Sequence, residues 1–145
     1  MKQRVRAVLV TPAGTMLLIK RIRPGVNPYA VLVGGGVEDT DATLEEALLR
    51  EIREEIAGVG RIERPFAELT NDKGEVEHFY VVGIEDWNFA DRTGPEFSHD
   101  DRGEYLLEEV PLTVEAVGAL NLMPPQVKDR LVAAVAAGDL SVATA

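Results

Sequence analysis

Three glutamates, Glu51, Glu54 and Glu55, are the side chains of this sequence that are best placed to do chemistry together. On a helix, the i, i+3, i+4 spacing brings their carboxylates within reach of one another. At about 4 Å, each like-charged pair costs roughly 4 kcal/mol at an effective dielectric constant near 20. A divalent cation removes this cost. Because the chain has no cysteine and only 2 histidines, these oxygen donors predict Mg²⁺, with Mn²⁺ as a substitute, rather than zinc.

The segment that carries the three glutamates is predicted to be an amphipathic helix. Asp41 or Thr43 is expected to cap its start, and Gly58 and Gly60 are expected to stop it. Its apolar residues recur at helical spacing: Leu44, Ala47, Leu48, Ile52 and Ile56.

A helical wheel separates the charged residues of this helix. Glu51 and Glu55 lie inside or beside the apolar stripe, whereas Arg50 lies on the outer face. A helix rich in glutamate is commonly just a solvated surface helix. Unpaired carboxylates against the buried side are costly, however, so this placement favours a ligand-binding role.

Three consecutive glycines, at positions 34–36, lie between a short predicted strand at 29–33 and the helix. Glycine lets the backbone approach an ion or a phosphate closely and leaves its carbonyl and N–H groups accessible. A glycine run alone more often marks only a turn. Next to this helix, it indicates a loop that takes part in ligand binding.

The other elements are predicted from apolar alternation and turn residues. Strands are expected at 4–11 and 15–22, which form a hairpin, at 61–70 and 75–84, which form a second hairpin, and at 104–110. A short helix is expected to open at 111–113 and run to 120, a last one at 126–137, and a long loop at 85–103. This order predicts an α/β fold, a mixed β-sheet between helices in an α/β/α sandwich. We expect a single domain at 1–138 and a short frayed tail at 139–145.

Charge is distributed unevenly along the chain. The net charge is −10, which argues against binding to a polynucleotide. The first 37 residues hold 6 of the 15 basic residues and none of the 25 acidic ones. Basic side chains facing carboxylates would suit a small phosphate-bearing ligand and metal ions, although strand-edge arginines are often simply solvated. No stretch approaches the roughly 20 apolar residues of a membrane span, and we expect a cytoplasmic protein.

Residues 34–60 resemble the Nudix box, whose pattern is Gly-x5-Glu-x7-Arg-Glu-U-x-Glu-Glu-x-Gly-U with U aliphatic. The segment from Arg50 to Glu55 matches this pattern in full. Asp41 replaces the first glutamate, with eight residues between it and Arg50 where the pattern has seven. Ala57 stands at the position of the last glycine, and Val33 replaces the proline that often precedes the first glycine.

The resemblance implies a Nudix-type fold and Mg²⁺-dependent hydrolysis of a nucleoside diphosphate linked to another group. It implies that Glu51, Glu54 and Glu55 hold metal or activate water. Arg50 would orient these carboxylates, and the carbonyl of Gly34 could complete the metal shell.

The segment Gly103-Glu104-Tyr105 looks like the Gly-Glu-Trp segment of MutT-like members of that family. By this resemblance Glu104 is a further metal ligand or the general base, a role for which Glu51 is the alternative. A solvated glutamate at the start of a strand is the simpler interpretation. Three other carboxylates of the same region compete for the role: Glu96, Asp100 and Asp101.

The chemistry expected is in-line attack of a metal-activated water on one phosphorus of the substrate. Arg21 and Arg23 are predicted to hold phosphates, unless they are merely solvated. Trp87 is predicted to contact a base.

The short chain, the Gly-Glu-Tyr segment and the pair Pro124-Pro125 look most like the MutT-like nucleoside triphosphate pyrophosphatases, which give a nucleoside monophosphate and pyrophosphate. The alternatives are hydrolysis of an ADP-sugar, ADP-ribose or a dinucleoside polyphosphate, and a catalytically silent nucleotide-sensing module. Gln126 and Val127 follow the prolines where an oxidised-guanine reader has an asparagine, so that specificity is unsupported. The resemblance also makes a homodimer plausible, which the sequence itself does not show.

Overall fold

Strand β1 (Gln3–Val10) shows how the sequence builds the sheet. Val5 and Leu9 are buried on one of its faces, and Val8 and Val10 on the other. Side chains of a strand alternate between the two faces of a sheet. A strand that is apolar on both faces must therefore be covered on both.

The computed structural model describes residues 2–91 and 103–140. Its other strands are β2 (Thr15–Ile22), β3 (Tyr29–Val31), β4 (Val33–Gly36), β5 (Val59–Thr70), β6 (Val76–Asp86) and β7 (Glu104–Pro111). The helices are α1 (Leu44–Ile56), α2 (Val114–Gly118), α3 (Pro125–Ala136) and a short 3-10 turn, η1 (Phe89–Asp91). No helix in these described ranges is long and apolar enough to cross a membrane.

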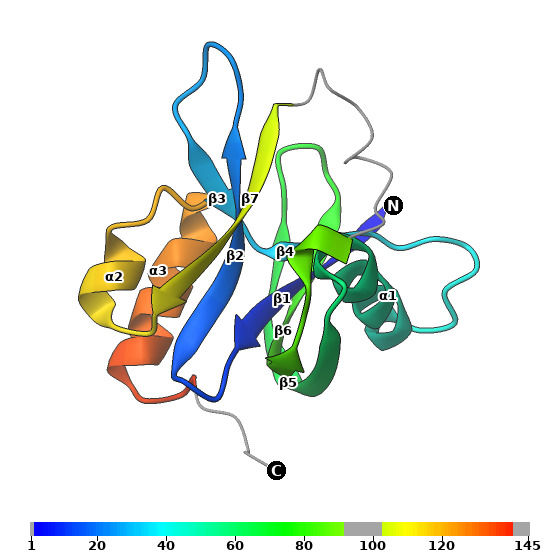
Figure 1. Ribbon diagram of the computed structural model, residues 1–145. Helices are drawn as coiled ribbons and strands as arrows, with labels where there is room; N and C mark the ends of the chain where they lie inside the picture. Colours follow the sequence, from blue (N-terminus) through cyan, green and yellow to red (C-terminus); the bar gives the residue numbers. More distant parts are fainter. Residues whose placement is uncertain (1, 92–102, 141–145) are drawn as a thin grey trace.

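The strands form one mixed sheet with helices on both sides (Figure 1). The strand order is β3-β2-β1-β6-β5, with β4 paired to β1 and β7 paired to β2. Strands β1 and β6 run parallel, and the other pairs are antiparallel. The predicted α/β fold with a mixed sheet between helices is confirmed.

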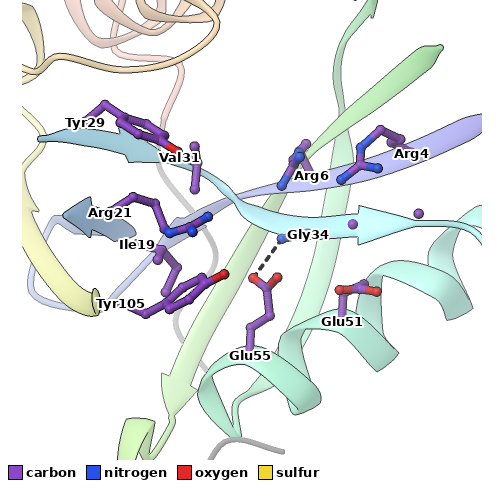
Figure 2. Close-up of a pocket in the computed structure, with 12 residues that line it drawn as sticks. Arg4, Arg6, Ile19, Arg21, Tyr29, Val31, Gly34, Glu51, Glu55 and Tyr105 are labelled. Carbon is purple, nitrogen blue, oxygen red and sulfur yellow. Dashed lines mark hydrogen bonds between the residues drawn. The ribbon is translucent and has the colours of Figure 1, made fainter. Parts of the chain in front are cut away.

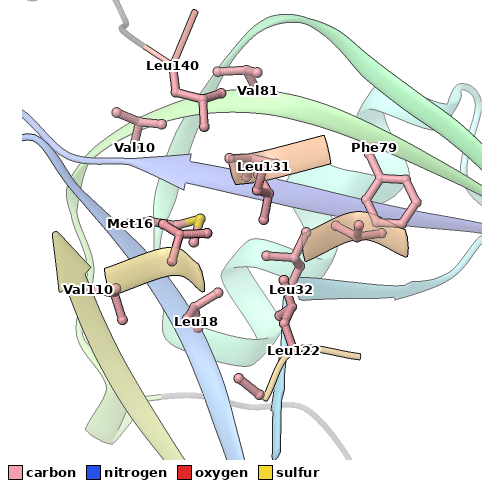
Figure 3. Close-up of a cluster of buried hydrophobic side chains, with 14 residues drawn as sticks. Val10, Met16, Leu18, Leu32, Phe79, Val81, Val110, Leu122, Leu131 and Leu140 are labelled. Atoms are coloured by element: carbon pink, nitrogen blue, oxygen red, sulfur yellow. The ribbon is translucent and has the colours of Figure 1, made fainter. Parts of the chain in front are cut away.

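Two apolar cores lie on the two faces of the sheet. Helix α1 packs Leu48, Ile52 and Ile56 against one face. Helices α2 and α3 pack against the other face, where Leu131 of α3 lies near Met16, Leu18 and Phe79 (Figure 3). Burying an aliphatic side chain of this size stabilises the fold by about 1.5–3 kcal/mol, so both helix layers are firmly attached to the sheet.

The first predicted hairpin is only partly formed. Strands β1 and β2 pair at two positions, Leu9 with Leu17 and Val10 with Met16, next to their turn. Farther along, β1 pairs with β4 and β6, while β2 pairs with β3 and β7. The two strands separate because the chain through β3 and β4 pairs first with one of them and then with the other.

The glycine run also differs from the prediction. Residues 34–36 lie in strand β4 and pair with β1, rather than forming a loop. Gly34 has a φ of +156°, and a Cβ atom there would collide with the carbonyl oxygen of Val5. Glycine is therefore required because the backbone of β1 comes too close for any side chain.

The ends of the predicted helices and loops shift slightly. Thr43 caps α1 by accepting a hydrogen bond from the amide of Glu46 at 3.0 Å. Ala57, in the left-handed conformation, ends the helix instead of a glycine, and β5 already begins at Val59. Strand β6 and turn η1 occupy the start of the predicted 85–103 loop, of which 92–102 lie outside the described residues.

The packed part of the chain extends past the predicted boundary at residue 138. Leu140 is buried in the same core as Leu131 of α3, and the amide of Asp139 donates to the carbonyl of Ala134 at 2.9 Å. The first two residues of the predicted frayed tail are thus fixed by packing and by a backbone hydrogen bond. Residues 141–145 lie outside the described residues.

Candidate functional site

A cavity of about 330 Å³ lies where β1 and β2 separate, beside the glycines of β4. Helix α1 contributes Glu51 and Glu55 to its wall. Arg4 and Arg6 of β1 and Arg21 of β2 contribute the basic groups (Figure 2). The cavity therefore presents acidic and basic side chains on either side of the three glycines of β4, which have no side chains.

The glycines of β4 set the positions of both cavity carboxylates. The amide of Gly34 donates a hydrogen bond to Oε2 of Glu55 at 3.2 Å (Figure 2). A Cβ atom on Gly35 would lie 2.6 Å from Oε2 of Glu51. The carboxylate of Glu51 therefore occupies space that is open only because Gly35 lacks a side chain.

Arg50 connects the helix to the loop that precedes it. Its Nε and Nη2 donate to the two oxygens of Asp41 at 3.0 and 2.9 Å, and Nη2 also donates to the carbonyl of Gly36 at 3.1 Å. Its Nη1 donates to Glu51 at 2.9 Å and to Glu54 at 2.7 Å. The helical wheel predicts an outward Arg50. The fold instead leaves its side chain 18% exposed, because it bends toward Asp41 and Gly36 in the chain ahead of the helix.

These contacts shift the protonation equilibria of both partners. The pKa of Arg50 is raised, first by the hydrogen bond to Asp41 and then by those to Glu54 and Glu51, against the opposing effect of burial. The hydrogen bond from Arg50 lowers the pKa of Asp41 below its ordinary value. Arg50 and Asp41 therefore form a charge-assisted brace that joins the helix to the preceding loop, with the charged form of each stabilised by the other.

The three glutamates do not all face one point. Glu51 and Glu55 line the cavity, whereas Glu54 is held by Arg50 and does not line it. Within residues 2–91 and 103–140, no group of three or more His, Asp and Glu side chains gathers at one point as a metal centre. The donor set still suits a hard divalent cation, since carboxylate oxygens and nearby backbone carbonyls are the ligands that Mg²⁺ and Mn²⁺ prefer.

Besides Glu54 and Arg50, three further predicted site residues do not line this cavity. Glu104 is exposed at the first position of β7, and Arg23 is exposed just after β2. Trp87 packs against the apolar core on the α1 side of the sheet. The competing carboxylates Glu96, Asp100 and Asp101 lie outside the described residues.

Tyr105 reaches the cavity from β7. Its backbone pairs with Arg21 in the β2–β7 register. The guanidinium carbon of Arg21 lies 3.8 Å from the centre of the Tyr105 ring, which is a cation–π contact. Tyr105 therefore supports a basic side chain of the cavity (Figure 2).

Sequence reasoning did not identify Arg4 and Arg6 as site residues, although it noted the basic N-terminal segment. Both alternate along β1 with the core residues Val5 and Ala7. Arginine at alternate positions of a strand whose other face is buried is the signal that could have revealed them.

A second cavity, of about 410 Å³, adjoins the first one. Arg6 and Val31 line both cavities. The second cavity is more apolar, and its walls include Leu69, Asn71, Glu77, Met123, Pro124, Pro125 and Gln126. A charged cavity and a mixed apolar one thus lie next to each other, with Arg6 and Val31 in the walls of both.

Comparisons with known proteins agree with this architecture. A family model described as the NUDIX domain matches residues 1–131. An uncharacterized Nudix hydrolase of Schizosaccharomyces pombe is 26% identical over 104 residues, which cover 70% of this chain and 50% of that protein. The chain therefore spans about half the length of this curated relative.

Solved structures share the fold at low identity. A MutT structure from work on the Aliivibrio salmonicida and Vibrio cholerae proteins has a TM-score of 0.66 and 16% identity, covering 91% of this chain and 96% of that one. An ADP-ribose pyrophosphatase from Streptococcus suis has a TM-score of 0.65 and 16% identity, covering 94% of this chain and 91% of that one. At these identities the likeness shows the fold alone.

Proposed function

The chain belongs to the Nudix family, and from that premise we propose that it hydrolyses the diphosphate linkage of a nucleoside diphosphate derivative. Within this class, we propose a MutT-like nucleoside triphosphate pyrophosphatase that releases a nucleoside monophosphate and pyrophosphate. The observation that carries the proposal is that two cavities of different character lie next to each other and share Arg6 in their walls. One has the charges that phosphates and a cation require, and the other has an apolar wall and polar edges.

The basic side of the first cavity supports phosphate binding. Arg4, Arg6 and Arg21 present guanidinium groups there, and these match phosphate oxygens in geometry and in charge. Tyr105 holds Arg21 in place by stacking. Arg23 lies farther away on the exposed chain, and we retain it only as a contact for the distal end of a longer phosphate chain.

The acidic side supports binding of a divalent cation. Glu51 and Glu55 would hold Mg²⁺ or Mn²⁺, with the carbonyl of Gly34 beside them and Glu54 as a further ligand. Such a cation, when bound, neutralises phosphate charge and makes water more acidic. Arg50 orients Glu51 and Glu54 through its hydrogen bonds, which keeps the cavity carboxylate from turning away.

The reaction needs one proton acceptor. Water attacks phosphorus, a new P–O bond forms, and the bridging P–O bond breaks with departure of the phosphate-containing leaving group. We assign Glu51 as the general base that accepts the proton of the attacking water, because its carboxylate lies in the cavity. Glu104 is retained as the alternative general base and metal ligand, since it adjoins Tyr105. Trp87 stays a predicted nucleobase contact for a nucleoside on the α1 side of the sheet, because it packs there and lines neither cavity.

The second cavity supports a nucleoside as the other half of the substrate. Its volume and mixed lining suit a ring system with polar edges. Pro124 and Pro125, which the sequence associates with MutT-like members, lie in its wall. The fold itself does not separate MutT-like activity from hydrolysis of ADP-ribose, ADP-sugars or dinucleoside polyphosphates, because both structural relatives superpose equally well.

Product identity decides between these substrates. The purified protein with Mg²⁺ is incubated with deoxynucleoside and ribonucleoside triphosphates, ADP-ribose, nucleotide sugars and a dinucleoside tetraphosphate, and the products are separated by chromatography. We expect triphosphates to give monophosphate and pyrophosphate. Glu55→Gln should abolish turnover, whereas Glu45→Gln, on the exposed side of the same helix, should not. Cleavage of ADP-linked compounds alone would replace the MutT-like assignment, and nucleotide binding without turnover would indicate a sensing module.

A further inference from the structure

The boundary between the two cavities is formed by an arginine that is already held in place. Arg6 donates from Nε to Oε1 of Glu77 at 3.1 Å and from Nη1 to the carbonyl of Leu32 at 3.1 Å. Oε2 of Glu77 in turn accepts from the side-chain amide of Asn71 at 3.1 Å. The guanidinium is therefore fixed on two sides by groups from β6 and from the link between β3 and β4.

The pair is too well buried to be an ordinary surface ion pair. The side chain of Arg6 is 19% exposed and that of Glu77 is 8% exposed. Exposed ion pairs contribute little to stability, and burial of charges costs free energy unless each one is hydrogen-bonded. An arginine on this face of β1 also interrupts the apolar series that Val8 and Val10 continue. Packing alone does not explain a charged pair in this position.

The orientation of Arg6 leaves donors for a ligand. Its hydrogen bonds to protein groups use Nε and Nη1. Among the described residues, no hydrogen-bond partner is seen for Nη2. Because Arg6 lines both cavities, a ligand that extends from one to the other must pass its side chain.

Resting on the proposed function, we propose that Arg6 binds the phosphoryl group to which the nucleoside is attached, and that Glu77 is a positioning residue that orients it. Arg4 and Arg21 line only the charged cavity and bind any phosphate chain. Arg6 is different because its charge is balanced by Glu77. It acts as a directed donor at the junction of phosphate and nucleoside, and so it selects substrates in which the two are joined.

The test compares the binding of two phosphate compounds in the presence of Mg²⁺. One is a non-hydrolysable nucleoside triphosphate and the other is inorganic tripolyphosphate, each titrated calorimetrically. The variant is the double substitution Arg6→Gln with Glu77→Gln, which leaves the net charge unchanged because one positive and one negative group are removed together. Its melting temperature is measured alongside.

We expect the double variant to bind the nucleotide about tenfold more weakly, as for loss of a charge-assisted hydrogen bond. Its affinity for tripolyphosphate should change less than about threefold, since the overall charge is the same. Arg4→Gln is the matched control and should lower the affinities for both ligands by similar factors. Arg6→Lys is a second variant that keeps the charge but lacks the planar fork of the guanidinium. It should also lower the affinity for the nucleotide more than the affinity for tripolyphosphate.

Unchanged nucleotide affinity in these variants would overturn the inference, and so would an equal loss for both ligands. A wild-type protein that binds the nucleotide no better than tripolyphosphate would overturn it as well. Nucleotide binding without hydrolysis would instead contradict the proposed activity, while the two affinities would still decide the role of Arg6.

Discussion

Replacement of Gly35 by alanine tests whether the position of Glu51 controls catalysis. The new Cβ atom would lie 2.6–2.8 Å from three atoms of the Glu51 carboxylate group. Ordinary van der Waals contact begins near 3.4 Å, so the carboxylate must move by roughly 0.6–0.8 Å. The backbone of Gly35 is not in the left-handed region, and alanine can adopt it without strain.

This displacement is large for a reacting group and small for the fold. Catalytic groups need to be held within about 0.5 Å of their productive geometry, and a 1 Å error can cost about 100-fold in rate. We therefore expect kcat to fall by about 10- to 100-fold. An off-rotamer glutamate costs about 0.5–1.5 kcal/mol, which the smaller entropy of the unfolded chain offsets by about 0.4–1 kcal/mol. The melting temperature should stay within roughly 4 °C of the wild type.

The neighbouring glycine gives a matched control. A Cβ atom on Gly36 would meet its nearest neighbour, Cε of Lys2, at 3.4 Å, which is ordinary contact. Gly36→Ala should therefore keep most of the activity. Steady-state kinetics on the preferred nucleotide and thermal melting of both variants complete the comparison. Full activity in Gly35→Ala, or an equal loss in Gly36→Ala, would refute the argument that Gly35 makes room for Glu51.

Asp41→Asn removes a carboxylate whose pKa is held below its ordinary value by Arg50. The ionised group stabilises the folded state above about pH 4 and loses this effect as the pH falls through its lowered pKa. The free energy of unfolding of the variant, measured by denaturant titrations between about pH 7 and pH 3, should therefore fall less steeply on acidification than that of the wild type. An equally steep fall in both proteins would contradict the brace. Tyr105→Leu removes the ring that stacks on Arg21 and should weaken nucleotide binding about two- to fivefold by calorimetry. Tyr105→Phe, which keeps the ring, should be closer to the wild type, and equal losses in both variants would assign the effect to the hydroxyl instead.

The helix and its glutamates could be predicted because their signals are local. Leu48, Ile52 and Ile56 repeat with the period of a helix, and the structure buries all three. The same period placed Glu51 and Glu55 beside the apolar stripe, where they line the cavity. The prediction that Arg50 lies on the outer face was wrong, because a helical wheel does not include the loop before the helix. The long side chain of Arg50 bends toward its hydrogen-bond partners in that loop.

For the basic side of the cavity, the sequence predicted an excess of basic residues but not which of them line the site. The sequence shows six basic residues before the first acidic one, but which of them reach the cavity depends on the pairing of strands. Arg21 reaches it because β7 pairs with β2 and brings Tyr105 beneath its guanidinium. Arg6 reaches it because β1 turns away from β2 and pairs with β4 and β6. These pairings join residues that are far apart in the sequence, and local periodicity carries no information about them.

The electrostatic argument that first indicated a cation site needs a different basis in the folded protein. Spacing alone suggested three carboxylates that repel one another until a cation arrives. In the structure, Arg50 lies between Glu51 and Glu54 at 2.9 and 2.7 Å, and the amide of Gly34 stabilises Glu55. The carboxylates are thus already compensated, and their repulsion cannot be the reason for binding a cation. For the proposed function, the reason lies in the cavity, where two oriented carboxylates face three arginines across the glycines of β4. A phosphate chain drawn in by the arginines would bring its own negative charge against Glu51 and Glu55, and a divalent cation would compensate that charge.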